Sequence, residues 1–96
     1  MNNSELKYRM IRAINEMCIV SNSRNFRVKA DKILKETINS PSYMLGQRVI
    51  EIKELVLKHY PEDDSIISYT IIQHMNRIEE LWEEEKLQPH YVKGSA

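Results

Sequence analysis

The sequence predicts an all-α fold, a compact bundle or orthogonal array of about four amphipathic helices. In four separate segments the apolar residues recur three and four positions apart, which is the spacing of one helix face. Short polar stretches, two of which contain proline, separate these segments. No segment alternates apolar and polar residues over the length of a strand, so we expect no sheet.

The first predicted helix begins at Asn3 or Ser4, because either side chain can accept a hydrogen bond from the free amides of the first turn. It runs to about Val20 and ends in the polar residues 21–24, which offer the backbone competing hydrogen bonds. Its apolar stripe consists of Leu6, Met10, Ile14 and Met17. We expect this stripe to be buried.

The second predicted helix spans about residues 25–39. Its apolar side consists of Phe26, Ala30, Ile33, Leu34, Thr37 and Ile38. The opposite side alternates in charge, which is typical of a solvated face. Ser40 and Pro41 follow as a capping residue and a proline, a pair that commonly starts another helix.

The third predicted helix starts at Pro41 or near Gly46 and ends at His59. Its start stays open, since a glycine in the first turn costs about 1 kcal/mol relative to alanine, and residues 40–46 could form a loop. Its stripe of Leu45, Val49, Ile52 and Val56 is flanked by Ile50 and Leu57. Tyr60 before Pro61 disfavours continuation of the helix.

The fourth predicted helix, about residues 65–87, is the longest and carries Ile71, Met75, Ile78 and Trp82 on one side. Gln88 and Pro89 end it. We therefore expect one helical domain over residues 1–88 and a flexible tail over 89–96. The residues expected at the centre of the core are Ile14, Ile33, Ile52, Ile71, Ile78 and Trp82.

Composition narrows the setting and the function class. One lone cysteine, Cys18, and a polar N-terminal segment favour a reducing, cytoplasmic environment. No apolar run approaches the length of about 20 residues that a membrane-spanning helix needs, so we expect no membrane insertion. The only glycines, Gly46 and Gly94, cannot form a glycine-rich phosphate loop.

The sequence offers no set of residues for catalysis or metal binding. His59, His74 and His90 are fifteen and sixteen residues apart, too far for one helix or turn to present two of them to a metal. Cys18 lies beside the buried stripe of the first helix, as an inert thiol does. We expect a protein that is not an enzyme and has no cofactor.

Charge is distributed unevenly along a chain whose net charge is zero. Residues 1–39 hold eight basic and four acidic side chains, whereas residues 61–96 hold three basic and eight acidic ones. A run of five glutamates occupies the last turns of the fourth helix: Glu79, Glu80, Glu83, Glu84 and Glu85. Negative charge is unfavourable at this end of a helix, so we expect compensation by the basic half of the chain, by a second copy or by another protein.

The leading hypothesis is a small non-enzymatic regulator or inhibitor that binds another protein through a helical surface and forms a homodimer. The large aromatic side chain within the acidic run and the arginines of the first helix are the expected interface, namely Glu79, Trp82, Glu83, Glu84, Arg9 and Arg12. The short, glycine-poor composition, rich in Ile, Asn and Lys, resembles that of bacteriophage accessory proteins that control host functions, defence or lysis timing.

The alternative hypothesis is a helical nucleic-acid-binding regulator. Basic side chains around a short helix-turn-helix could reach phosphates, namely Arg24, Arg27, Lys29, Lys32 and Lys35. Asp31 and Glu36 interrupt this set. A binding surface for nucleic acid is normally basic over a wider area, so this hypothesis ranks second.

Overall fold

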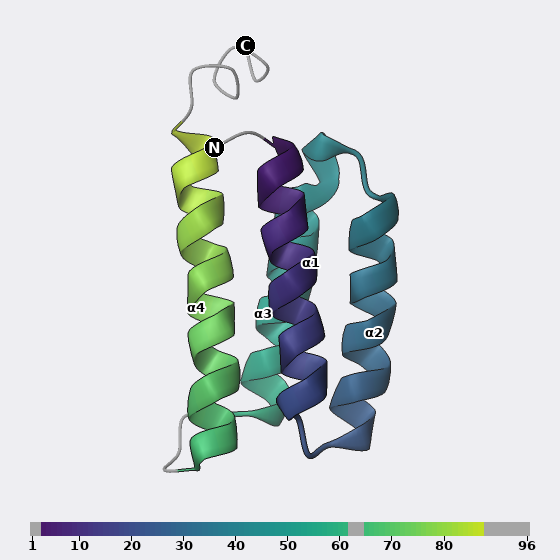
Figure 1. The fold of residues 1–96 in the computed structure, drawn as a ribbon, viewed down its shortest axis with the longest axis vertical. Coiled ribbons are helices and arrows are strands. Elements are labelled where there is room, and N and C mark those ends of the chain that lie inside the picture. The colour runs from purple at the N-terminus through teal and green to yellow at the C-terminus, as the bar shows by residue number, and fades with distance from the viewer. Residues whose placement is uncertain (1–2, 62–64, 88–96) are drawn as a thin grey trace.

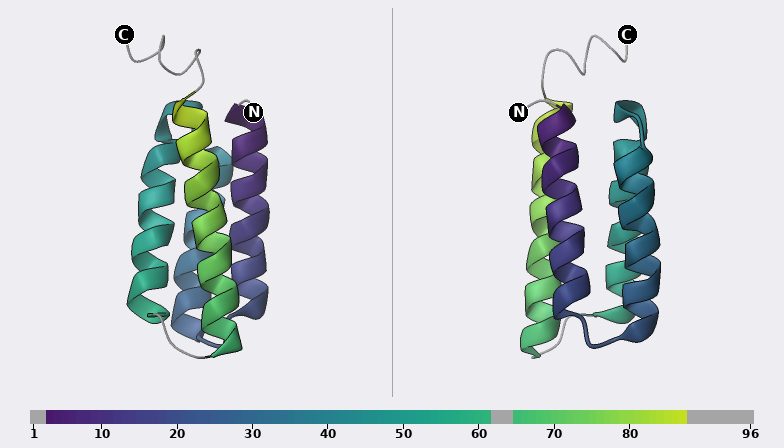
Figure 2. Two further views of the ribbon diagram at one scale, coloured as in Figure 1. Left: turned by 90° about the vertical axis from the view of Figure 1, so that its left-hand side faces the viewer. Right: turned by 45° about the vertical axis from the view of Figure 1, so that its right-hand side comes forward.

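The computed structural model describes residues 3–61 and 65–87 of the chain. They form four α-helices and one 3-10 turn: α1 (Asn3–Val20), α2 (Arg24–Asn39), η1 (Ser42–Met44), α3 (Leu45–His59) and α4 (Ile66–Lys86). Consecutive helices run in opposite directions, each packs against its neighbour in the chain, and α4 returns beside α1 (Figures 1 and 2). The all-α prediction is confirmed.

The inward faces of the four helices form one apolar core. The predicted stripe of α1 is completely buried, as are Ile52, Ile71 and Ile78. Ile33 is also buried, so five of the six residues expected at the centre of the core lie there. Trp82 is the exception, because it is only half-buried and packs on the edge of the core between α3 and α4.

Serine caps and one proline set most of the helix ends. The Oγ atom of Ser23 accepts from the backbone N–H three residues on at 3.2 Å, and Ser65 makes the same bond at 3.0 Å. Helix α3 ends at His59, with Tyr60 as its C-cap before Pro61. The predicted end of α3 at His59 is confirmed, and α4 lies within one residue of the expected 65–87 at each end. Helix α2 begins at Arg24, which the sequence assigned to the polar stretch before it. The side chains of Asn3 and Ser4, the stop at Gln88–Pro89 and the tail lie outside the described part of the chain.

The stretch between α2 and α3 combines the two possibilities that the sequence left open. Ser40 ends α2 instead of capping a new helix, and its Oγ donates to the carbonyl of Glu36 at 2.6 Å. Pro41 precedes the 3-10 turn η1, and α3 begins directly after it at Leu45. Gly46 therefore lies inside the first turn of α3.

Besides Trp82, four residues depart clearly from the burial that periodicity predicts. Ile38, Ile50 and Leu57 lie at the edges of their apolar stripes and are 49%, 50% and 52% exposed. Glu85, expected on a solvated acidic face, is completely buried. Spacing assigns a residue to a side of its helix, but burial at the edge of a stripe depends on how the neighbouring helix packs.

A tyrosine joins the turn between α1 and α2 to the end of α3. The Tyr60 hydroxyl lies 2.6 Å from the Ser21 hydroxyl, donates to Oδ1 of Asn22 at 2.9 Å and accepts from the backbone N–H of Asn22 at 3.2 Å. Its ring meets that of Phe26 edge to face, with centroids 5.1 Å apart. Residues 38 and 39 positions apart in the sequence are thus fixed together.

None of the four described helices is both long enough and apolar enough to cross a membrane.

Candidate functional site

The acidic run on α4 is partly neutralised by cations from the second half of the chain. Glu79 pairs with Lys53 of α3 at 2.9 Å, and Glu83 pairs with Lys86 at 2.9 Å. Glu80 pairs with Arg77 at 3.2 Å. For these three glutamates the compensation expected from the sequence therefore comes from α3 and from α4 itself, not from residues 1–39.

The ring of Trp82 covers the first turn of α3. A β-carbon built on Gly46 would lie 2.7 Å from Cζ2 of this ring, so the indole packs directly against the glycine backbone. Lys86 Nζ lies 5.8 Å from the ring centroid on α4. Glycine is needed here because of a close approach between helices, which the sequence does not reveal.

Apolar side chains continue from Trp82 along the boundary between α3 and α4. Ile50 and Leu57 lie three residues before and four residues after Lys53, the partner of Glu79, so all three side chains lie on the same side of α3. Ile50 and Leu57 are each about half exposed. We call this surface the α3/α4 face, defined by Ile50, Lys53, Leu57, Glu79, Trp82 and Glu83.

Arg9 and Arg12 belong to α1 and lie in a shallow groove of about 400 Å³ between α1 and α4. This groove is on a different side of α4 from the α3/α4 face. We call it the arginine groove and define it by Tyr8, Arg9, Arg12, His74, Arg77 and Leu81. Ala13 and two glutamates, Glu5 and Glu16, complete its lining. Three guanidinium groups thus share one groove with two carboxylates.

The arginines of the groove are held only by weak contacts. Arg9 pairs with Glu5 at 3.2 Å and Arg77 with Glu80 at 3.2 Å, in pairs whose side chains are about half exposed to water. Arg12 lies over the ring of Tyr8, 5.8 Å from its centroid, and has no carboxylate within ion-pair distance among the described residues. Exposed ion pairs contribute little, so these guanidinium groups can exchange partners at low cost.

The predicted interface residues therefore lie on two surfaces. Glu79, Trp82 and Glu83 belong to the α3/α4 face, and Arg9 and Arg12 belong to the arginine groove. Glu84 is exposed on α4 and lines a shallow depression with Asn76, Glu79, Glu80 and Glu83. Within one chain, therefore, Arg9 and Arg12 do not share a surface with Glu79 and Glu83.

Sequence reasoning missed several residues of both surfaces. Tyr8 and Arg12 are four apart on one helix, a spacing that could have indicated their contact. Arg77 was overlooked because the segment that contains it is strongly acidic. Ile50 and Leu57 flank a buried stripe in the sequence, and their exposure depends on helix packing.

The basic residues of the alternative hypothesis are spread around α2. Arg27 donates to the carbonyl of Ser21 at 2.8 Å on the α1 side, and Lys35 pairs with Asp31 at 3.0 Å. Lys29 and Lys32 line a groove toward α3 together with Glu36, Glu51 and Glu54. Arg24 is exposed in the first turn of α2. Helices α1 and α2 run antiparallel side by side, unlike the steeply crossed pair of a helix-turn-helix (Figure 1).

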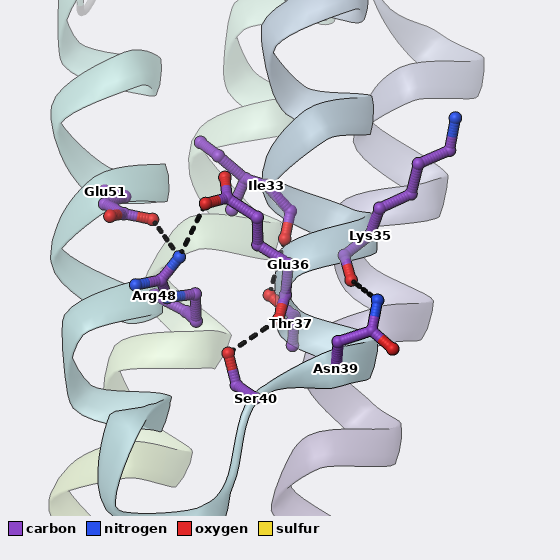
Figure 3. Close-up of polar contacts among 8 residues, drawn as sticks. All are labelled: Ile33, Lys35, Glu36, Thr37, Asn39, Ser40, Arg48 and Glu51. Carbon is purple, nitrogen blue, oxygen red and sulfur yellow. Dashed lines mark hydrogen bonds and ion pairs between the residues drawn. The ribbon is translucent and has the colours of Figure 1, made fainter.

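A buried arginine fixes α2 to α3. The side chain of Arg48 is only 10% exposed, and its Nη1 lies 3.1 Å from Glu36 Oε2 and 3.1 Å from Glu51 Oε1 (Figure 3). Glu36 belongs to α2, whereas Arg48 and Glu51 belong to α3. The two carboxylates offset the cost of burying the guanidinium, so this cluster is a tie between helices. Glu36 and Arg48 also line a shallow surface depression of about 530 Å³ between α2 and the start of α3.

Among the described residues Cys18, His59 and His74 belong to no cluster of side chains that could hold a metal ion, and His90 lies outside the described residues. Cys18 is half-buried, and burial raises the pKa of its thiol, with a further rise from Asp31 and an opposing effect from Arg27. A raised pKa disfavours the reactive thiolate. His59 meets Phe26 edge to face with centroids 6.0 Å apart, and His74 lies in the arginine groove.

Comparison of the chain with protein-family models, with curated proteins and with solved structures found no match.

Proposed function

We propose that this protein is a non-enzymatic binding protein that regulates or inhibits another protein by covering part of its surface with the α3/α4 face. The observation that carries the proposal is the position of two half-exposed apolar side chains, Ile50 and Leu57, on either side of the Lys53–Glu79 ion pair and beside the half-buried Trp82. An apolar strip bordered by charges is typical of a protein interface.

The chemistry of this face indicates the kind of partner it fits. Covering the exposed half of each aliphatic side chain contributes about 1 kcal/mol, and tryptophan is a common anchor of interfaces. Glu79 and Glu83 border the strip on the α4 side. A partner helix or strand with an apolar centre and a basic edge complements both features.

Affinity purification from the cells that produce this protein tests the proposal. Three baits are compared: the wild type, a face variant with Ile50→Arg and Leu57→Arg, and a matched control with Ile19→Arg and Val28→Arg. Ile19 and Val28 are exposed apolar residues of α1 and α2, 69% and 62% exposed. Circular dichroism of each bait verifies that it is folded.

We expect a protein that the wild type and the control retain in comparable amounts and that the face variant loses. With that protein purified, titration calorimetry should show an affinity about tenfold or more weaker for the face variant. Retention that is equal for all three baits, or that nuclease treatment abolishes, would contradict the proposal. The second result would favour nucleic-acid binding instead.

A further inference from the structure

The arginine groove is rich in guanidinium groups, and the outer surface of α4 beside it is rich in carboxylates. Within one molecule Arg77 and Glu80 pair across this boundary at 3.2 Å, in an exposed ion pair that can exchange partners. Three guanidinium groups line the groove, whereas Glu80 and Glu84 lie just outside it on α4. Arg77, Glu80 and Glu84 are three and four residues apart, so they form one outward stripe along the helix. The stripe is basic at one end and acidic at the other.

We infer that the protein forms a two-fold symmetric homodimer in which α4 packs antiparallel to α4 of a second copy, so that the arginine groove of each copy faces the acidic end of the other stripe. A two-fold axis across α4 near residues 80 and 81 brings Arg77 opposite Glu84 of the second copy. Symmetry repeats the contact, so each dimer contains it twice.

Charge also excludes the parallel arrangement. A two-fold axis along the bundle would place Arg77 against the same arginine of the second copy and glutamates against glutamates, and like charges at an interface are strongly unfavourable. In the antiparallel arrangement Arg12, which lines the same groove, comes to the level of the acidic end of the partner helix. Among the described residues Arg12 lies over the Tyr8 ring and makes no ion pair, so its guanidinium can pair with a carboxylate of the second copy.

The area of this surface limits the affinity of the dimer. On each copy α1 and α4 lie side by side, each about 30 Å long and about 10 Å wide, and together they offer a surface of about 600 Å². The total of about 1,200 Å² is at the lower limit of stable interfaces, and most of it is polar. We therefore expect a weak dimer whose formation depends on salt.

This dimer is independent of the proposed function. It uses the arginine groove and the outer edge of α4, and it leaves Ile50, Leu57 and Trp82 uncovered on both copies. The assembly then presents two α3/α4 faces, and loss of the dimer would leave binding of a single partner intact. The two proposals can fail separately.

Sedimentation equilibrium of the purified chain tests the dimer, over about 10 to 500 µM protein at about 0.05 M and 0.5 M salt. We expect a concentration-dependent dimer at low salt that dissociates at high salt. Arg77→Glu and Glu84→Arg should each weaken association about tenfold or more, because each opposes like charges twice. The double variant carries the exchanged charges and should recover the dimer.

Two controls distinguish recognition from misfolding. Lys35→Glu makes the same change of charge on an exposed residue of α2 and should leave the dimer unchanged. Arg12→Glu is a second groove variant, for use if circular dichroism shows that Arg77→Glu is unfolded. A wild type that stays monomeric at low salt, or a folded double variant that does not recover association, overturns the inference.

Discussion

The indole ring of Trp82 packs against the backbone of Gly46, where a β-carbon would lie 2.7 Å from Cζ2, 3.1 Å from Cη2 and 3.3 Å from Cε2 of the ring. Contacts of this length force the ring to move. The ring of Trp82 on α4 therefore leaves room only for glycine at position 46, although alanine is the better helix former. Gly46 has a low helix propensity, but it lies where α3 and α4 approach closely.

Gly46→Ala should lower the free energy of unfolding by about 1 kcal/mol, because the cost of displacing the ring exceeds the gain in helix propensity. In the Trp82→Ala background the same change should become stabilising by up to about 1 kcal/mol, since the obstacle is gone. Urea denaturation of the four proteins measures both effects. An equal effect of Gly46→Ala in the two backgrounds would show that the ring does not limit this position.

Tyr60→Phe should destabilise the protein by about 1 to 3 kcal/mol, because it removes the shared partner of the buried Ser21 hydroxyl and of the polar groups of Asn22, and Asn22 alone is exposed enough to bond water instead. The ring contact with Phe26 is kept, so the loss isolates the hydroxyl. Tyr43→Phe is the matched control, since Tyr43 is 82% exposed and its change should be within about 0.5 kcal/mol of zero. Thermal and urea denaturation measure both variants.

Arg48→Met should be tolerated within about 1 kcal/mol, because it removes a buried charge and keeps most of the side-chain volume. The side chains of Glu36 and Glu51 are 43% and 31% exposed, so both carboxylates can turn toward water, although Oε1 of Glu51 is buried while Arg48 is present. The combined change Glu36→Ala and Glu51→Ala leaves Arg48 buried and unpaired, and should cost about 3 kcal/mol or more. If urea denaturation gave the opposite order, the cluster would act mainly through charge attraction.

Cys18 should give a pH-dependent contribution to stability. Its pKa is raised in the folded state, mainly by burial, so the unfolded chain loses the thiol proton at a lower pH than the folded one. The contribution is then complete below the ordinary thiol pKa of about 8.5 and is lost as the pH rises through the folded value. The difference in free energy of unfolding between the wild type and Cys18→Ala should fall as the pH rises above about 8. A difference that does not change with pH would contradict this assignment.

The approximate helix spans and the end of α3 before Pro61 could be predicted from local rules, whereas the caps at Ser23 and Ser65 were identified only in the structure. Ser23 and Ser65 are short polar side chains that accept from free amides, and Tyr60 before Pro61 disfavours further helix, so these ends are set by neighbours in the sequence. The buried stripes followed from periodicity in the same way. The burial of Glu85 and the exposure of Ile38 did not, because each depends on which helix packs alongside.

The candidate surfaces were less predictable than the fold. Arg9 and Arg12 were identified by charge, but their groove exists only because α4 brings Arg77 and His74 beside them from more than sixty positions away. Ile50 and Leu57 could be assigned to a side of α3, whereas their exposure required the position of α4. A surface formed by two helices depends on how they pack, whereas the sequence shows only which residues each helix contributes.

The order of the helices in space has a consequence for how the chain reaches this structure. Each of the first three helices packs on the next one in the sequence, so most contacts join residues that are close along the chain. Proteins with such local topology fold within microseconds to milliseconds, because little loop entropy is lost before contacts form. The docking of α4 on α1 joins the most distant segments and carries the largest loop-closure cost. The pair of helices that lines the arginine groove is thus the pair whose association gains least from proximity along the chain.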